Sequence, residues 1–239
     1  MTLPLPPILS DDHALFLDFD GTLAPLQAHA DDVHLTDAQK TMLIKLADVR
    51  DGAMALLSGR DVRDLAKRTP EGLMRVGNHG LYRMAGGETE FPNVQDPPTD
   101  LVTLLEMAVA KHDGAFLEVK GPVATIHYRA CPDAGPVLID AVQSAAARQT
   151  GYISKVGNHV AEALPESANK GAALEALMQE QPYEGRVPVM VGDDTTDEDG
   201  FLAAQRLGGF GVKVGAGETV ARKRLKDVSD VWTWLEKSL

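Results

Sequence analysis

The feature that most constrains the fold of this chain is a set of four short apolar runs. They occupy residues 14–17, 53–57, 187–191 and 210–214. The first two runs continue into Asp18 and Ser58, and the third continues through Gly192 into Asp193. Apolar runs of this length are typical of strands that are buried on both faces, as in a parallel sheet.

Helical patterns lie between these runs. Apolar side chains recur at helical spacing over residues 36–49 and 170–180, and a further helix is expected over 61–68. Strands that alternate with helices predict a doubly wound α/β core. Ligands of such folds bind at the carboxyl ends of the strands, where Asp18, Ser58 and Asp193 are expected.

The middle of the chain has a different organisation. After a proline-rich linker at 93–100, the pattern predicts a helix, two strands, a second helix and two more strands. These lie at residues 101–112, 115–120, 123–129, 137–149, 152–156 and 159–164. We therefore expect an inserted α+β domain (αββαββ) at 97–165, between core segments 1–96 and 166–239. A hairpin centred on Gly86–Gly87 is expected at 83–91.

Composition limits the partners of this chain. Its 239 residues carry a formal net charge of −12, which argues against nucleic acid or an anionic membrane as a partner. Local cations can still hold a small anion. The single cysteine, Cys131, excludes an internal disulfide framework and fits a reducing compartment. The first residues lack the features of a signal peptide, so we expect a cytoplasmic protein.

Two aspartates one residue apart follow the first apolar run. Asp18 and Asp20, in the stretch DFDGTL, point the same way if the strand continues, and they repel unless a cation lies nearby. Mg²⁺ prefers such oxygen ligands. One carboxylate can then attack phosphorus while the other transfers protons. The alternative is an ordinary strand end with a turn, in which Asp and Gly are common.

Three further segments carry candidate groups. Ser58, in LLSGR, offers a hydroxyl and backbone N–H groups to an oxyanion, or else caps a helix. Lys170 begins a helix, where a positive charge is unfavourable without an anion, unless it is a solvated surface lysine. The acidic stretch at 189–201 holds Mg²⁺ or forms a solvated helix start. It does not match an EF-hand, and the chain contains no P-loop and no complete G-x-G-x-x-G motif.

The order of these segments resembles that of the haloacid dehalogenase superfamily of phosphotransferases over nearly the whole chain. The resemblance implies a Rossmann-like core with a cap. It makes Asp18 the nucleophile and Asp20 the general acid/base, with Ser58 and Lys170 binding phosphate. It implies Mg²⁺ held by the Asp18 carboxylate, the Asp20 carbonyl and Asp193. Asp194 or Asp197 would lie next to these metal ligands and orient them without binding the ion.

Within that superfamily, the detail is similar to the trehalose-6-phosphate phosphatase family. The matching pieces are DFDGTLAPL, SGR, GNHG, EVK, IHYR, NKGAAL and GDDTTDE. The resemblance implies that Glu118, Lys120 and Glu162 recognise sugar hydroxyls. It adds core residues to the expected substrate site, namely Gly21, Thr22, Ser58, Gly59, Arg60, Asn78 and His79. The chain departs from the family pattern at Leu164, where an arginine is usual, and after Gly80, where an acid is usual.

The expected activity is Mg²⁺-dependent hydrolysis of trehalose 6-phosphate through an aspartyl phosphate. The first alternative is the same chemistry on sucrose phosphate, glucosylglycerol phosphate or mannosyl-phosphoglycerate. The second is a non-catalytic domain that binds a phosphosugar. A trehalose-6-phosphate synthase is the expected pathway partner, and a monomer is slightly favoured.

Overall fold

The computed structural model describes residues 3–27 and 30–239. The chain divides into two compact units, one formed by 1–92 and 169–239 and the other by 93–168. The expected domain boundaries at 97 and 165 lie just inside the second unit. Within the described residues, no helix is both long enough and apolar enough to cross a membrane.

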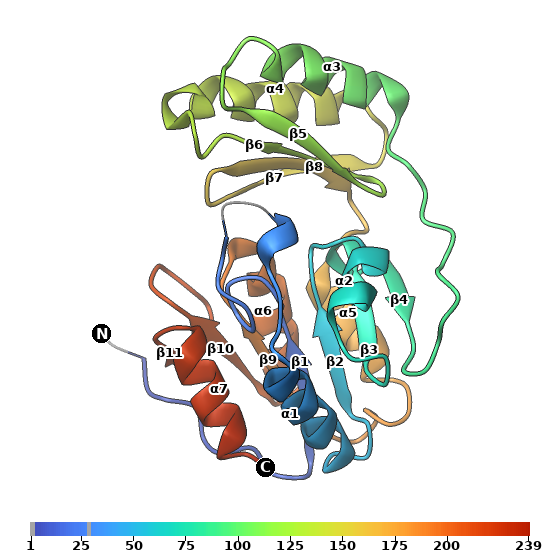
Figure 1. The fold of residues 1–239 in the computed structure, drawn as a ribbon, viewed down its shortest axis with the longest axis vertical. Coiled ribbons are helices and arrows are strands. Elements are labelled where there is room, and N and C mark those ends of the chain that lie inside the picture. Colours follow the sequence, from blue (N-terminus) through green and yellow to red (C-terminus); the bar gives the residue numbers. More distant parts are fainter. Residues whose placement is uncertain (1–2, 28–29) are drawn as a thin grey trace. The chain divides into compact units, whose positions relative to one another are not determined.

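The first unit is built on a seven-stranded sheet (Figure 1). Its strands in spatial order are β11 (Lys223–Leu225), β10 (Phe210–Val214), β9 (Val187–Gly192), β1 (His13–Leu17), β2 (Met54–Leu57), β3 (Met74–Gly77) and β4 (Tyr82–Met84). All neighbours are parallel except β3 and β4. The four expected strands are therefore present, and β1 lies at the centre between β9 and β2.

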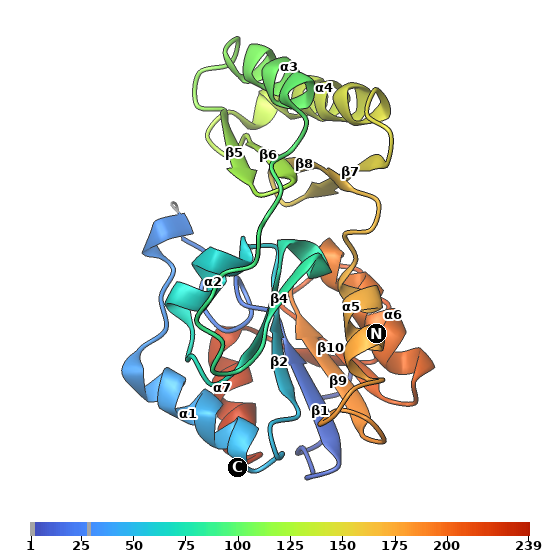
Figure 2. The same cartoon turned by 90° about the vertical axis from the view of Figure 1, so that its right-hand side faces the viewer.

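Helices cover both faces of this sheet, as expected for a doubly wound fold. On one face lie α1 (Asp37–Asp48), α2 (Val62–Arg68) and α7 (Val228–Glu236), packed on the side chains of Leu15 and Leu17. On the other lie α5 (Lys170–Leu177) and α6 (Glu198–Arg206), packed on Phe16. Figure 2 shows α1 and α2 on one side of the strands and α5 and α6 on the other. The apolar run is buried from both sides because each face has its own helices.

The helices begin where the sequence supplies caps. Thr36 and Gln39 form a capping box at α1, in which the Thr36 hydroxyl accepts from the Gln39 N–H at 3.3 Å and the Gln39 side chain accepts from the Thr36 N–H at 2.8 Å. Asn169 caps α5 by accepting from the Ala172 N–H. This second cap fixes the helix start at Lys170.

The second unit has the expected αββαββ order. Its elements are α3 (Thr99–Val109), β5 (Phe116–Lys120), β6 (Val123–His127), α4 (Gly135–Ala147), β7 (Tyr152–Gly157) and β8 (Val160–Pro165). The strands form an antiparallel sheet in the order β5-β6-β8-β7. Both helices pack on the face that carries Ala124, Ile126 and Ala163. The opposite face is the polar one.

The hairpin expected at 83–91 is wrong. The antiparallel pair is β3 with β4, joined through a 3-10 turn at Asn78–Gly80, and residues 88–91 form no strand. Side chains bond the backbone after β4 in place of a second strand. Glu88 accepts from the Ala85 N–H at 2.8 Å, and Arg75 donates to the Ala85 carbonyl at 2.9 Å. Strands β3 and β11 and helix α7 were also not expected.

Candidate active site

Polar residues from three adjacent strands meet at one edge of the seven-stranded sheet. Asp18 follows β1, Ser58 follows β2, and Asp193 follows β9. Backbone hydrogen bonds continue the ladder into them: the Asp18 N–H donates to the Val191 carbonyl, and the Ser58 N–H donates to the Val76 carbonyl, both at 2.9 Å. The sheet therefore brings together groups that lie up to 175 positions apart in the chain.

Lys170 joins this edge from the first turn of α5. Its ammonium lies 2.7 Å from Asp18 Oδ1 and 2.6 Å from Asp197 Oδ1. All three residues are buried, with 2%, 4% and 0% of their surfaces exposed, respectively. A buried lysine between two carboxylates is fixed in position, since burial without partners is costly. The surface-lysine alternative for Lys170 is therefore excluded.

The acidic stretch after β9 is folded by Asp197. Its Oδ2 accepts from the backbone N–H groups of Asp193 and Asp194, each at 3.0 Å. Gly192 permits this turn, because a Cβ there would lie 2.2 Å from Asp197 Cγ. Both oxygens of Asp197 are thus used, one by the loop and one by Lys170. It orients the loop that carries Asp193.

Asp193 packs against the turn that follows Asp20. A Cβ built on Gly21 would lie 2.1 Å from Asp193 Oδ2, and Gly21 has a φ of 75°. Both the close approach and the left-handed backbone require glycine. Lys213, on β10, donates a hydrogen bond to the Asp193 carbonyl. Lys213 was not singled out from the sequence as a residue of this site.

The carboxylates of Asp18, Asp193 and Asp197 lie close together, and the pKa values of Asp18 and Asp193 show the effects of burial and of the mutual repulsion of their negative charges. Burial raises the pKa of Asp18 well above its usual range, opposed by Lys170 and reinforced by Asp197 and Asp193. Burial and the charges of Asp197 and Asp194 raise the pKa of Asp193 to about 7. Burial lowers the pKa of Lys170, but Asp18 and Asp197 outweigh it and raise the pKa above the ordinary lysine value. One lysine does not balance three acids.

This imbalance fits a divalent cation. One oxygen from each of Asp18, Asp193 and Asp197 lies within 4.8 Å of the others. The donors are all carboxylate oxygens, the ligand type that Mg²⁺ prefers. Because Asp197 is already bonded through both oxygens, Asp18 and Asp193 are the carboxylates best suited to bind the ion. The residues present therefore fit the expected metal.

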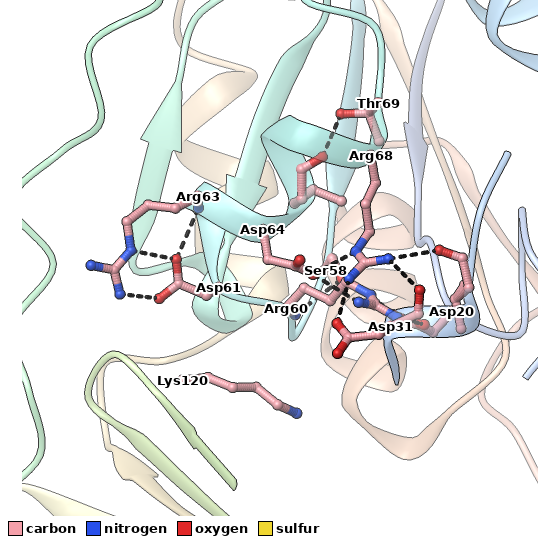
Figure 3. Close-up of polar contacts among 12 residues, drawn as sticks. Asp20, Asp31, Ser58, Arg60, Asp61, Arg63, Asp64, Arg68, Thr69 and Lys120 are labelled. Carbon is pink, nitrogen blue, oxygen red and sulfur yellow. Dashed lines mark hydrogen bonds and ion pairs between the residues drawn. The ribbon is translucent and has the colours of Figure 1, made fainter. Parts of the chain in front are cut away.

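Asp20 has a different partner. Figure 3 shows Arg60 directed at its carboxylate. Arg60 Nε donates to Asp20 Oδ2 and Nη2 donates to Asp20 Oδ1, both at 2.7 Å. Arg60 also donates through Nη1 to Asp64 Oδ2 at 2.7 Å, and Arg68 donates to the same oxygen at 2.8 Å. The sequence did not indicate Asp64 or Arg68.

The remaining core residues form the turn beside Ser58. The Ser58 hydroxyl accepts from the Arg60 N–H at 3.1 Å, and the Ser58 carbonyl accepts from the His79 N–H at 3.0 Å. The His79 ring lies against Gly59, where a Cβ would be 2.6 Å from the ring. Asn78 and His79 both have positive φ, 52° and 58°. Two such residues in succession are uncommon and occur most often at functional sites.

Asn78 is buried, and its side-chain oxygen accepts from the Val62 N–H at 3.0 Å at the start of α2. The Thr22 side chain is fully buried in the turn after Asp20. Within the first unit, the structure thus brings Gly21, Thr22 and Asp193 to one part of the edge. It brings Ser58, Gly59 and the Asn78–His79 turn to another.

Glu118, Lys120 and Glu162 lie in the second unit, on the polar face of its sheet. Strand register places Glu118, Thr125, Glu162 and Lys155 in one row across β5, β6, β8 and β7. Thr125 donates to Glu162 at 3.0 Å. The sequence analysis did not identify Thr125 as a residue of this face. The alternation of side chains along β6 would place it opposite Glu118, but only once the register of the two strands is known.

Glu118 is held by two neighbours. Its Oε2 lies 2.7 Å from His127 Nε2 and 3.2 Å from Lys120 Nζ. Burial opposes ionisation, but the His127 hydrogen bond and the Lys120 charge outweigh it and lower the pKa of Glu118 to about 2. The Phe116 ring stacks on His127 with centroids 4.5 Å apart. This face offers a fixed carboxylate, an ammonium and an aromatic ring.

Solved structures of other proteins share this fold. The chain matches the structure titled C. albicans Trehalose-6-phosphate phosphatase C-terminal domain with a TM-score of 0.85 at 22% identity, covering 98% of this chain and 96% of that one. It matches a haloacid dehalogenase-like hydrolase from Bacteroides thetaiotaomicron with a TM-score of 0.64 at 17% identity, covering 94% and 98%. At these identities the likeness shows a shared fold, a parallel-sheet core with an inserted α+β unit.

Sequence comparison shows the family to which the chain belongs. The Trehalose-phosphatase family model matches residues 16–230. The chain is 41% identical over 241 residues to the Trehalose-6-phosphate phosphatase of Escherichia coli (strain K12), covering 99% of this chain and 91% of that protein. The chain therefore belongs to the trehalose-phosphatase family and is a phosphoric monoester hydrolase.

Proposed function

We propose that this protein hydrolyses trehalose 6-phosphate to trehalose and phosphate, with Mg²⁺ and through an aspartyl phosphate on Asp18. The observation that carries the proposal is the Lys170–Asp18 contact beside Asp193, at the carboxyl edge of the sheet, in a chain of this family. The name of the E. coli relative supports the choice of sugar.

In the first half-reaction, the Asp18 carboxylate attacks the phosphorus atom of the ester. Lys170 binds Asp18 Oδ1, so we assign the attack to Oδ2. The bond from phosphorus to the sugar oxygen breaks, and Asp20 gives that oxygen its proton. The positive charge of Lys170 favours the negative charge that accumulates on the transferring phosphoryl group.

In the second half-reaction, Asp20 takes a proton from a water molecule. The oxygen atom of that water attacks the phosphorus atom of the aspartyl phosphate. The bond to Asp18 breaks, which frees phosphate and restores both carboxyl groups. Asp197 keeps Lys170 and the Asp193 loop in place throughout. Mg²⁺, when bound by Asp18, Asp193 and the Asp20 carbonyl, supplies charge neutralisation for the phosphoryl oxygens. Ser58 and the Gly59–Arg60 backbone are the expected phosphate contacts.

For the second unit, we propose that the polar sheet face binds the sugar. Glu118 and Glu162 accept hydrogen bonds from sugar hydroxyls, and Lys120 donates to them. Their support is geometric: all three side chains lie on the sheet face opposite the two helices of this unit. Sites that hydrogen-bond a hydroxyl discriminate strongly against analogues that lack it.

The test is phosphate release from a panel of sugar phosphates, with Mg²⁺ and with chelator. We expect rapid Mg²⁺-dependent release from trehalose 6-phosphate and much slower release from sucrose phosphate, glucosylglycerol phosphate and mannosyl-phosphoglycerate. Asp18→Asn should abolish release while the melting temperature stays near that of the wild type. If another member of the panel is hydrolysed faster than trehalose 6-phosphate, that compound is the substrate instead. Binding without release would favour a phosphosugar-binding domain.

A trehalose-6-phosphate synthase remains the expected source of the substrate. A cytoplasmic location, and a monomeric state, which is slightly favoured, remain predictions from the sequence, to be examined by fractionation and by sedimentation of the purified chain.

A further inference from the structure

The guanidinium of Arg60 is committed to carboxylates rather than open to solvent. Two of its N–H groups form parallel bonds to the two oxygens of Asp20, and a third reaches Asp64. Its side chain is only 8% exposed. Parallel bonds of this kind fix the plane of a carboxylate as well as its position, which a single contact cannot do.

Arg60 is itself held from several sides. Its guanidinium carbon lies 5.4 Å from the centre of the Phe19 ring, and its backbone N–H donates to the Ser58 hydroxyl. Asp64 Oδ2 accepts hydrogen bonds from Nη1 of Arg60 and from Nε of Arg68, the second at 2.8 Å. Charges thus alternate from Asp20 through Arg60 and Asp64 to Arg68, as Figure 3 shows. Such networks restrict side-chain motion more than isolated pairs.

Arg68 anchors the far end of this network. It donates to the Val33 carbonyl at 3.0 Å and pairs with the exposed Asp31 at 3.0 Å. The Asp31 pair contributes little, because exposed ion pairs are weak. The bond to the buried Val33 segment and the bond to Asp64 are therefore the ones that fix Arg68.

We infer that Arg60 is a positioning residue for Asp20, and that Asp64 and Arg68 hold Arg60 in place for this task. The inference rests on the proposed function, in which Asp20 transfers the proton. A carboxylate has about four lone-pair directions, and the Arg60 fork uses two of them. The others can carry the proton to the leaving oxygen. Without the fork, Asp20 rotates about its side-chain bonds and seldom faces that oxygen.

This role differs from the substrate contact that the family resemblance implies for Arg60. A residue that binds the phosphate stabilises the bound substrate, so its removal raises KM. A residue that holds the proton donor acts in bond cleavage, so its removal lowers kcat and leaves KM near its starting value. It also matters more when the leaving oxygen is a poor leaving group that needs a proton.

The experiment compares trehalose 6-phosphate, which has an alkoxide leaving group, with p-nitrophenyl phosphate, which leaves readily without a proton. Arg60→Ala should lower kcat/KM on the sugar phosphate by about 100-fold, within the range of general acid catalysis, and kcat/KM on the aryl phosphate by less than about tenfold. We compare kcat/KM because it reports the steps up to release of the leaving group and not the hydrolysis of the aspartyl phosphate, which both substrates share. Arg60→Lys keeps the positive charge but cannot form two parallel hydrogen bonds to Asp20. Its activity on the sugar phosphate should therefore lie between those of the wild type and Arg60→Ala.

A double-mutant cycle with Asp20→Asn gives the second readout. If Arg60 acts through Asp20, the double variant should be no slower on the sugar phosphate than Asp20→Asn alone, since residues that act as a unit are not additive. Losses that multiply would overturn the inference, as would equal losses of kcat/KM on the two substrates or a raised KM at unchanged kcat.

Arg63→Ala is the matched control. Arg63 also forms a two-bond fork to an aspartate, Asp61, at 2.8 Å, and the bonds drawn for it in Figure 3 run to Asp61 rather than to Asp20. We expect its kcat on both substrates to stay at the wild-type value. If Arg60→Ala fails to fold, Arg60→Lys with and without Asp20→Asn decides the question. If the wild type does not hydrolyse trehalose 6-phosphate, the proposed function fails, and the cycle is run on the alkyl phosphate that it does hydrolyse.

Discussion

The ammonium of Lys170 lies 2.7 Å from Asp18 Oδ1, although the two residues are 152 positions apart in the chain. The same ammonium lies 2.6 Å from Asp197 Oδ1. Lys170 begins α5, where its charge opposes the helix macrodipole, and the two carboxylates offset this effect. With Asp193 nearby, the cluster holds more acid groups than lysines. This excess of negative charge suits a bound cation.

Removing one of these acids should stabilise the protein without metal. In chelator at about pH 8, where Asp193 is ionised, Asp193→Asn should raise the melting temperature by about 2–4 °C, the shift expected per kcal/mol for a chain of this size. The physical reason is lost repulsion from Asp197 and Asp194. Mg²⁺ should raise the melting temperature of the wild type and leave that of the variant nearly unchanged.

The control for this prediction is Asp140→Asn, which removes a charge from the exposed side of α4. It should change neither the melting temperature nor the response to Mg²⁺. A lower melting temperature for Asp193→Asn in chelator would contradict our account of the cluster.

Gly21→Ala should damage the site more than the fold. The new Cβ would overlap Asp193 Oδ2 and displace it, and misplaced catalytic groups cost about 10- to 100-fold in kcat. Gly87→Ala is the matched control, because Gly87 has a similar φ of 80° but no atom within 4 Å of the added Cβ. Both variants should lose about 1–2 kcal/mol of stability from the left-handed backbone. Equal activity in both would mean that Asp193 is not needed in its place.

The second unit should govern substrate choice. Glu118→Gln or Lys120→Ala should lower kcat/KM on trehalose 6-phosphate by about 100-fold or more, because each removes a polar partner of the sugar. The loss on p-nitrophenyl phosphate should be small. Glu106→Gln, on the exposed face of α3, serves as the control and should leave both substrates unaffected. Similar losses on the two substrates would show that this face does not read the sugar.

Acid should weaken the second unit through Glu118. The pKa of this carboxyl is about 2 when folded and 4.5 when unfolded, so the unfolded chain binds more protons between these values. Stability is therefore fully present above about pH 4.5 and is lost as the pH falls toward 2. Because 30% of the side chain is exposed, we expect a loss of about 1–2 kcal/mol. Urea unfolding of the wild type and of Glu118→Gln should converge at low pH. A constant difference would contradict the assignment.

Part of this fold follows from local patterns. The apolar runs before Asp18, Ser58 and Asp193 predicted three buried parallel strands because burial on both faces removes the need for polar alternation. The hairpin at 83–91 failed because Gly86–Gly87 is a turn signal that says nothing about which segments pair. Strand β4 pairs with β3 instead, and Arg75 and Glu88 bond the backbone that follows.

The sequence by itself determined which acids follow which strands, and hence that Asp18 and Asp193 meet where parallel strands end. It also determined that Lys170 starts a helix. Only the tertiary structure decided the partners: Asp197 for Lys170, Arg60 for Asp20, and His127 for Glu118. Strand and helix formation depend on neighbours in the chain, whereas ion pairs depend on side-chain directions that are fixed only when distant elements pack.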